Sequence, residues 1–385
     1  MGGLTVRRTA SFLLLLALFG FTCYGLDEPS VSAESAVLMV AETGELVYAK
    51  NEHERRGMAS TTKIMTALLT LECATPQKQV TVTEQMAAVE GTSMGLLAGD
   101  KVTYHDLVYG MLLASGNDAA NTAAISIAGS IPAFARLMNE RAVQSGMTNT
   151  SFVTPSGLDD ENHYSTAYDM ALLGCEAIKN PDFLMACSSV QAKLCYGNEP
   201  YTRYLSNHNK LLKTFDGALG IKTGFTKKSG RCLVSAAERN GVTLVCVTLK
   251  APDDWRDHEA LLEYGFERAS VKTLSCSLPQ VTVYGGEAET AAVELCEPLS
   301  VATQCGSDII LTQVIIKPYC IAPLKKGDIA GEVRISVDGK TVKTVPVTVK
   351  EDVKAITQEV IKKPSIFKRL AEKISDFFCK RKVIT

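Results

Sequence analysis

A serine and a lysine three positions apart, Ser60 and Lys63, are the first residues whose types and spacing could do chemistry. Residues three apart lie on one face of a helix, so this spacing would set an amine beside a hydroxyl. In the first turn of a helix, unpaired backbone N–H groups and the helix dipole favour the negative charge that an attacking serine develops. The pair predicts Ser60 as a nucleophile and Lys63 as the base that activates it.

The same spacing also fits an ordinary structural role. Serine is a favourable helix N-cap, and Lys63 would then be a solvated lysine. A second Ser-x-x-Lys occurs at Ser365 and Lys368, so chance can supply the spacing. The choice between the two interpretations depends on what accompanies Ser60 along the chain.

Two further motifs accompany the pair. Ser-Gly-Asn at residues 115–117 places a hydroxyl and a carboxamide on one side of a predicted helix–helix corner. Lys-Thr-Gly at 222–224 lies on a predicted edge strand, where Gly224 lets a ligand approach the backbone. Motifs of these three kinds, in this order, are characteristic of penicillin-binding proteins and class A β-lactamases.

With these motifs, the sequence resembles the low-molecular-mass penicillin-binding proteins that are serine-type D-alanyl-D-alanine carboxypeptidases (peptidase S11). The resemblance covers nearly the whole chain, with further matching segments at 149–152, 156–159, 206–212 and 217–230. It implies an α/β (α+β) catalytic domain of the penicillin-binding-protein/β-lactamase-like kind, with an antiparallel sheet flanked by helices. A small all-β C-terminal domain would follow. The catalytic interpretation of Ser60 is therefore favoured over the capping one.

The resemblance implies acyl transfer onto Ser60, in cell-wall biosynthesis and remodelling. Neutral Lys63 would take the Ser60 proton, and Ser60 would attack the carbonyl of the penultimate D-alanine in a peptidoglycan stem pentapeptide. Ser115 would relay a proton to the leaving amine, and water would release the acyl-enzyme. The implied partners are the stem peptide and, as covalent inhibitors, β-lactam antibiotics. No cofactor is implied.

The resemblance also implies a set of substrate-binding residues. Asn117 would hold the substrate amide, while Lys222 and Thr223 would bind the terminal carboxylate beside Gly224. Arg256 matches the position of an arginine that assists carboxylate binding in the family. Each of these side chains supplies a function that the Ser-x-x-Lys pair lacks.

The backbone N–H groups of Ser60 and Phe225 would form the oxyanion hole. Two positions depart from the family pattern: Phe225 stands where family members often carry histidine, and His208 stands where some relatives have arginine. A lysine acts as a base only when its pKa is lowered, and burial beside Lys222 would lower the pKa of Lys63.

Two other functions stay open at this stage. A class A-like β-lactamase would use the same nucleophile, but it needs a carboxylate that activates the deacylating water. No convincing glutamate motif lies between Asn117 and Lys222. A non-catalytic wall-binding relative would keep the fold without the chemistry, and the intact motifs argue against it.

Hydrophobic periodicity predicts the elements that must position these motifs. Residues 36–40 and 45–49 predict a hairpin, and 239–241 is a strong turn between two strands beside the Lys222 strand. Residues 104–113 and 119–138 predict helices. Thr166 is a predicted helix N-cap.

At 385 residues, the chain exceeds the usual size of one domain. Its net charge of −2 gives no reason to expect nucleic-acid binding. We expect four parts, namely a signal peptide at 1–33, a catalytic domain at 34–272, a β-rich domain at 273–352 and a basic amphipathic membrane-associating helix at 353–385.

The two ends of the chain predict export. Arg7 and Arg8 precede the apolar run 12–21, and small residues offer cleavage after Gly25 or after Ala33. The basic amphipathic tail favours a membrane interface over docking on its own protein or a coiled-coil partner. We expect the outer face of the cytoplasmic membrane, or a secreted or periplasmic location.

The 12 cysteines are scattered and include no Cys-x-x-Cys, which argues against a zinc or redox site. Several lie in apolar runs, such as Cys246, and are predicted core residues. The five histidines include no two at helical ligand spacing, so no metal site is predicted.

Overall fold

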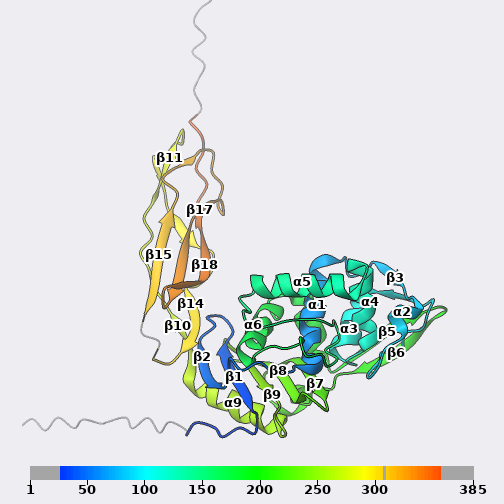
Figure 1. Ribbon diagram of the computed structural model, residues 1–385. Coiled ribbons are helices and arrows are strands. Elements are labelled where there is room, and N and C mark those ends of the chain that lie inside the picture. The colour runs from blue at the N-terminus through cyan, green and yellow to red at the C-terminus, as the bar shows by residue number, and fades with distance from the viewer. Residues whose placement is uncertain (1–26, 307–308, 357–385) are drawn as a thin grey trace, which may run out of the picture.

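Figure 1 shows the computed structural model of the chain, which describes residues 27–306 and 309–356. A helix-rich part holds a central sheet, and an elongated all-β part extends from one side of it (Figure 1). Most of the predicted signal peptide and most of the predicted C-terminal helix lie outside the described residues.

The central sheet has five antiparallel strands in the order β2-β1-β9-β8-β7. The predicted N-terminal hairpin is confirmed, and so is the tight turn at Asn240 and Gly241, which have φ angles of 52° and 78°. The strand that carries Lys222 is an edge strand, as predicted. The five strands are β1 (Ser35–Val40), β2 (Leu46–Lys50), β7 (Ala218–Thr226), β8 (Gly230–Arg239) and β9 (Val242–Leu249).

Both faces of this sheet are covered, which explains why its inner strands are apolar along most of their length. In β9, Leu244 and Cys246 belong to the core that includes helix α9 (Asp254–Arg268). Val245 and Val247 belong to the larger core on the opposite face, with the other helices. Successive residues of a strand point to opposite faces, so one apolar strand serves two cores.

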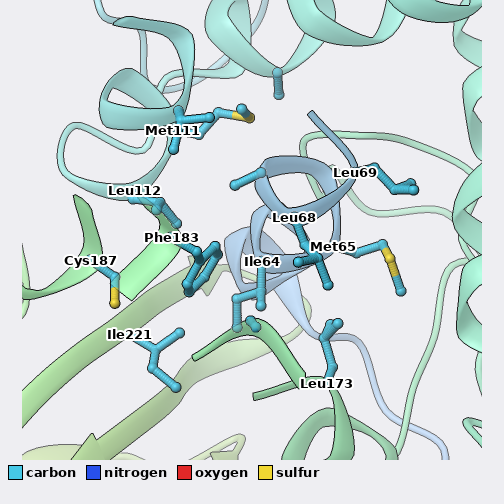
Figure 2. Close-up of a cluster of buried hydrophobic side chains, with 14 of the residues drawn as sticks. Ile64, Met65, Leu68, Leu69, Met111, Leu112, Leu173, Phe183, Cys187 and Ile221 are labelled. Carbon is cyan, nitrogen blue, oxygen red and sulfur yellow. The ribbon is translucent and has the colours of Figure 1, made fainter. Parts of the chain in front are cut away.

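Helix α1 (Lys63–Cys73) is the centre of the larger core, as Figure 2 shows. Ile64, Met65 and Leu68 are at most 2% exposed. Burial of side chains of this size stabilises by roughly 1.5–3 kcal/mol each, so the start of α1 is held firmly. The surrounding helices are α3 (Tyr104–Leu112), α4 (Asn117–Ala128), α5 (Ile131–Gln144), α6 (Ala167–Ala177) and α7 (Pro181–Ser188).

The stretch over 119–138 is helical, as predicted, but it consists of two helices with a break that was not predicted. Helix α4 ends at Ala128, and its C-cap Gly129 has a φ of 78°. Ser130 caps α5 by accepting a hydrogen bond from Ala133 N at 3.3 Å. Glycine at a helix C-terminus and proline in the first turn of the next helix are ordinary boundary signals. The predicted N-cap Thr166 is confirmed, since its Oγ1 accepts from Asp169 N at 3.0 Å.

A hairpin of β5 and β6, which the sequence analysis did not predict, supports the loop at residues 91–96. Tyr196 Oη donates to the Met94 carbonyl at 2.8 Å, and Arg203 donates to the Gly95 carbonyl at 2.7 Å. The hairpin and the other short elements are β3 (Gln79–Thr81), α2 (Glu84–Ala87), β4 (Lys101–Thr103), β5 (Gln191–Gly197), β6 (Pro200–Ser206) and α8 (Leu211–Thr214).

The all-β part begins directly after α9. Thr303 Oγ1 and Ala302 N each donate at 2.6 Å to carboxylates of the first hairpin, on Glu45 and Glu42 respectively. These contacts hold its base against the helix-rich part. Its strands are β10 (Ala269–Thr273), β11 (Val281–Tyr284), β12 (Thr290–Ala291), β13 (Val293–Leu295), β14 (Ser300–Gln304), β15 (Ile310–Ile316), β16 (Cys320–Ile321), β17 (Ile329–Val337) and β18 (Lys340–Val349).

In residues 27–306 and 309–356, no helix combines the length and the apolarity needed to cross a membrane. The cysteines of these ranges are free thiols, and Cys246 is fully buried, as predicted for a core residue. Burial raises the pKa of the Cys175 and Cys187 thiols to about 12, so these two are inert packing groups.

Candidate active site

A cavity of about 450 Å³ lies where β7 meets the start of α1 and the α3–α4 corner. Its lining brings together residues from all three motifs, and two of these residues, Ser60 and Gly224, are 164 positions apart in the sequence. Six of the predicted site residues line the cavity, namely Ser60, Ser115, Asn117, Thr223, Gly224 and Phe225. Lys63 and Lys222 are buried residues of the same motifs.

Ser60 lies in a 3₁₀ turn, η1 (Ala59–Thr62), that leads straight into α1. The predicted pairing is present: Lys63 Nζ donates to Ser60 Oγ at 3.0 Å. The same amine donates to the Ser156 carbonyl at 2.7 Å, which holds it in place from the other side. The two contacts aim the lysine at the serine hydroxyl.

Lys63 is fully buried. Its pKa lies well below its usual value, first because burial disfavours the ammonium and second because of the charge of Lys222. Asp118 opposes this shift. A neutral amine hydrogen-bonded to a serine hydroxyl can act as a general base.

Gly157 supports the turn before the nucleophile. Ala59 has a φ of +47°, which is unusual for a residue with a side chain. A Cβ added at Gly157, itself at φ +86°, would lie 1.9 Å from the Ala59 carbonyl oxygen. Only glycine allows this approach of the two chain segments.

The middle motif forms the corner between α3 and α4. Ser115 has a φ of 59°, and its carbonyl accepts from Thr92 Oγ1 at 2.6 Å. Asn117 Nδ2 donates to the Glu90 carbonyl at 2.6 Å. In the described part of the chain, no group hydrogen-bonds to the buried Oδ1 of Asn117. A ligand N–H is a suitable partner for this oxygen.

Lys222 is 1% exposed, and its Nζ donates to the Thr223 carbonyl at 2.9 Å. Burial lowers the pKa of Lys222 to about 7. A Cβ added at Gly224 would lie 3.0 Å from Ser60 N, so β7 runs in close contact with the nucleophile turn. Lys222 thus contributes an amine to the site, and Gly224 lets the β7 backbone approach Ser60.

The predicted contact of Arg256 with the substrate carboxylate stays a prediction, and the position of this side chain does not favour it. Arg256 is exposed on α9, and the described residues that line the cavity do not include it. Arg231 on β8 lines the cavity instead, opposite Phe225 in the strand pairing, and its Nε donates to Asp254 at 2.9 Å. Sequence position alone could not reveal this, because the arginine reaches the site through the β7–β8 register.

The two positions that depart from the family pattern both line the cavity. The Phe225 side chain is 64% exposed, so its ring lies at the rim. His208 is also exposed at the rim, where partial desolvation and then the charge of Lys222 lower its pKa. Neither ring is packed into the floor of the site.

Sequence reasoning missed several residues that support the site. Asp118 is fully buried and accepts from the backbone N–H groups of Met94 and Leu96 at 2.9 Å each, which ties the 91–96 loop to the α4 N-terminus. Ser156 binds Lys63 through its carbonyl. No side-chain pattern could have indicated a backbone acceptor, whereas Asp118, directly after Asn117, was a visible acidic residue at a helix start.

Within residues 27–306 and 309–356, no group of three or more metal-ligating side chains is positioned to hold a metal ion. The acyl-transfer arrangement above draws on a serine, lysines and backbone groups. Its chemistry is that of a nucleophile with an adjacent base.

Two sequence families match the chain. The family described as D-alanyl-D-alanine carboxypeptidase matches residues 24–253, and the one described as penicillin-binding protein 5, C-terminal domain, matches residues 273–355. The first match covers more than half of the 385 residues.

Characterised relatives match over most of their length. D-alanyl-D-alanine carboxypeptidase DacF of Bacillus subtilis (strain 168) is 32% identical over 342 residues, which cover 85% of this chain and 87% of the relative. D-alanyl-D-alanine carboxypeptidase DacC of Escherichia coli (strain K12) is 32% identical over 375 residues, covering 90% and 92%.

Solved structures match as well. Penicillin binding protein 5 from Haemophilus influenzae has a TM-score of 0.61 and 29% identity, covering 86% of this chain and 100% of that chain. D-alanyl-D-alanine carboxypeptidase DacD from Francisella tularensis has a TM-score of 0.61 and 28% identity, covering 85% and 95%. The predicted fold class, with its antiparallel sheet, flanking helices and all-β C-terminal domain, is confirmed.

Proposed function

Because the chain belongs to the D-alanyl-D-alanine carboxypeptidase family, peptidase S11, we propose that it removes the terminal D-alanine from peptidoglycan stem pentapeptides through an acyl-enzyme on Ser60. It is a D-alanyl-D-alanine carboxypeptidase of the serine type. The observation that carries the role of Ser60 is the 3.0 Å hydrogen bond from the buried amine of Lys63.

Acylation begins with proton transfer. The lowered pKa of Lys63 leaves a neutral amine that takes the Ser60 proton as Oγ attacks the carbonyl carbon of the penultimate D-alanine. The new bond joins Oγ to that carbon, and the peptide C–N bond then breaks. Ser115, which lines the same cavity, relays a proton to the leaving amine of the terminal D-alanine.

Substrate binding relies on both the amide and the carboxylate. The open acceptor on Asn117 Oδ1 supports its role as the partner of a substrate N–H. Lys222, Thr223 and the newly identified Arg231 are the groups that attract the terminal carboxylate. The proximity of β7 to Ser60 N supports an oxyanion hole formed by the N–H groups of Ser60 and Phe225.

Penicillins bind covalently to the same serine in this proposal, since a β-lactam presents a strained amide and a carboxylate to the same groups. The class A-like β-lactamase and the non-catalytic wall-binding relative are not favoured, because the matched relatives are named carboxypeptidases along most of this chain. Rapid penicillin turnover, in place of a long-lived adduct, would point to the β-lactamase.

We propose that the protein is exported and held at the outer face of the cytoplasmic membrane, or periplasmic or secreted. The basis is the sequence of the two ends: a signal peptide with Arg7 and Arg8, and a basic amphipathic tail at 353–385 that binds the membrane surface.

The test of the catalytic proposal uses Ser60→Ala. We expect it to abolish both D-alanine release from a pentapeptide and the mass increase on penicillin treatment, because Ser60 carries the hydroxyl that is hydrogen-bonded to Lys63 Nζ. Peptide mapping of the wild-type adduct should locate it on Ser60. An adduct elsewhere, or D-alanine release by the variant, would contradict the proposal.

A further inference from the structure

His163 lies behind the nucleophile turn and outside the lining of the active-site cavity. It is 4% exposed, and both of its ring nitrogens are engaged. Val153 N donates to Nδ1 at 2.9 Å, and Nε2 lies 2.8 Å from Thr62 Oγ1. Nothing in the mechanism above uses this side chain.

The contacts determine the direction of each hydrogen bond. A backbone N–H can only donate, so Nδ1 carries no proton, and the proton of the neutral ring is on Nε2. Nε2 therefore donates to Thr62 Oγ1, whose own proton goes to the Ala59 carbonyl at 2.8 Å. Burial lowers the pKa of His163 to about 4, against the opposing charges of Asp160 and Asp159, so the ring is neutral near pH 7.

This chain of hydrogen bonds runs from His163 through Thr62 Oγ1 to the Ala59 carbonyl, whose peptide group matters for catalysis. The Ala59 carbonyl and the Ser60 N–H belong to one planar peptide group and point in opposite directions. A hydrogen bond that holds the Ala59 oxygen therefore also sets the direction of the Ser60 N–H. Ala59 has the costly φ of +47°, so its turn needs such support.

We propose that His163 is a positioning residue that acts through Thr62 to hold the Ala59–Ser60 peptide plane, and so aims the Ser60 N–H at the developing oxyanion. The inference rests on the proposed acyl-transfer function of Ser60. An oxyanion donor is used more in the transition state than in the ground state. Losing its alignment therefore lowers kcat and leaves KM nearly unchanged.

The experiment compares three variants of the full chain. His163→Leu removes both hydrogen bonds. In His163→Gln the side-chain NH₂ group can occupy the place of Nε2 and donate a hydrogen bond to Thr62 Oγ1. In His163→Asn the side-chain oxygen can occupy the place of Nδ1 and accept a hydrogen bond from Val153 N, but the side chain does not reach Thr62. For D-alanine release we expect kcat to fall on the order of 10²-fold in His163→Leu and His163→Asn, with KM within about twofold, and to recover substantially in His163→Gln.

Two further measurements guard against a purely structural explanation. Titration with fluorescent penicillin gives the fraction of active protein, so that kcat is expressed per competent site. Thr62→Val, at a fully buried position, should reproduce the loss, and the double variant with His163→Leu should lose no more than either single change.

His258 provides a matched control. It is also fully buried between two hydroxyls, Ser235 Oγ at 2.6 Å and Thr248 Oγ1 at 2.9 Å, but it lies on α9. His258→Leu should lower the melting temperature. It should leave KM and the kcat per active site unchanged.

The inference is overturned if the His163 variants keep the wild-type kcat per active site, if only KM changes, or if His163→Gln is no better than His163→Leu. Failure of the proposed function is a separate outcome, since Ser60→Ala would then still release D-alanine.

Discussion

Lys63 and Lys222 are two buried amines in one site, and their protonation states decide how each can act. Lys63 must be neutral to take a proton, while Lys222 attracts a carboxylate only when it is charged. Burial favours the neutral form of both amines, and the charge of Lys222 lowers the pKa of Lys63 further. A bound substrate carboxylate raises the pKa of Lys222 again, because it stabilises the ammonium form.

We expect KM for a pentapeptide substrate to be constant below pH 7 and to rise above it. Lys222, with its pKa of about 7, is charged below that pH and becomes neutral as the pH increases through it, so attraction for the terminal carboxylate is lost on the alkaline side. Steady-state kinetics on either side of pH 7 measures this. Lys222→Arg keeps its charge and should show no such rise, and a KM that falls with increasing pH would refute the assignment.

The two arginines near the site provide a second prediction. Arg231→Ala should raise KM roughly tenfold, because a charge-assisted hydrogen bond to the carboxylate is lost. Arg256→Ala is the matched comparison, since Arg256 is exposed on α9 away from the cavity lining, and it should leave KM unchanged. If KM instead rose in Arg256→Ala and stayed unchanged in Arg231→Ala, Arg256 would be the carboxylate-binding arginine, as its sequence position predicts.

Among the elements, the η1–α1 junction carries the most constraint. Two distant chain segments converge on it, namely β7 at Gly224 and the loop at residues 156–157. The apolar residues of α1 hold the junction from behind, among the side chains of Figure 2. The nucleophile is thus fixed by long-range packing as well as by its own turn.

Gly157→Ala should therefore reduce acylation by penicillin by more than tenfold. Its new Cβ would overlap the Ala59 carbonyl and displace the turn that presents Ser60. Gly129→Ala is the control, because Gly129 also has a positive φ but has no atom within 4 Å of an added Cβ. This control should lose about 1 kcal/mol of stability and keep its acylation rate. Equal acylation losses in the two variants would show that backbone strain, not overlap, is responsible.

At the scale of the whole molecule, the residues that line the catalytic cavity are far in the sequence from the proposed membrane tail. The residues that line the cavity end at Trp255, whereas the all-β part that precedes the tail extends to Ala355, which pairs with Gly286. Figure 1 shows this all-β part as an elongated extension of the helix-rich part. Activity on soluble peptides should thus be independent of the tail.

Deleting the residues after Lys363 should release the exported protein from membranes, because the tail combines an apolar face with clustered lysines and arginines. Membrane fractionation with penicillin labelling measures the distribution. The truncated protein should keep its kcat and KM on soluble pentapeptide, which would show that it is folded. Full retention on membranes would contradict the proposed anchor.

Local spacing and motif order were sufficient to predict the chemistry. Ser60 and Lys63 are neighbours on one turn, and the Lys222 segment shows its strand character in its own residues, so both follow from short-range geometry. The turn at Asn240 and Gly241 and the cap at Thr166 are equally local. The break between α4 and α5 was also a local signal, at Gly129 and Ser130, but the apolar pattern concealed it.

Only the tertiary structure showed which residues that are distant in the sequence contact one another at the site. The Ser156 carbonyl reaches Lys63 from 93 residues away, Arg231 reaches the cavity through its register opposite Phe225, and His163 reaches the nucleophile turn through Thr62. Burial, which lowers the pKa values of both lysines, likewise depends on every element packed around them. The sequence was therefore sufficient to predict the proposed reacting groups, because their spacing is local. The fold determined the pKa values and the orientations of these groups, because both depend on distant parts of the chain.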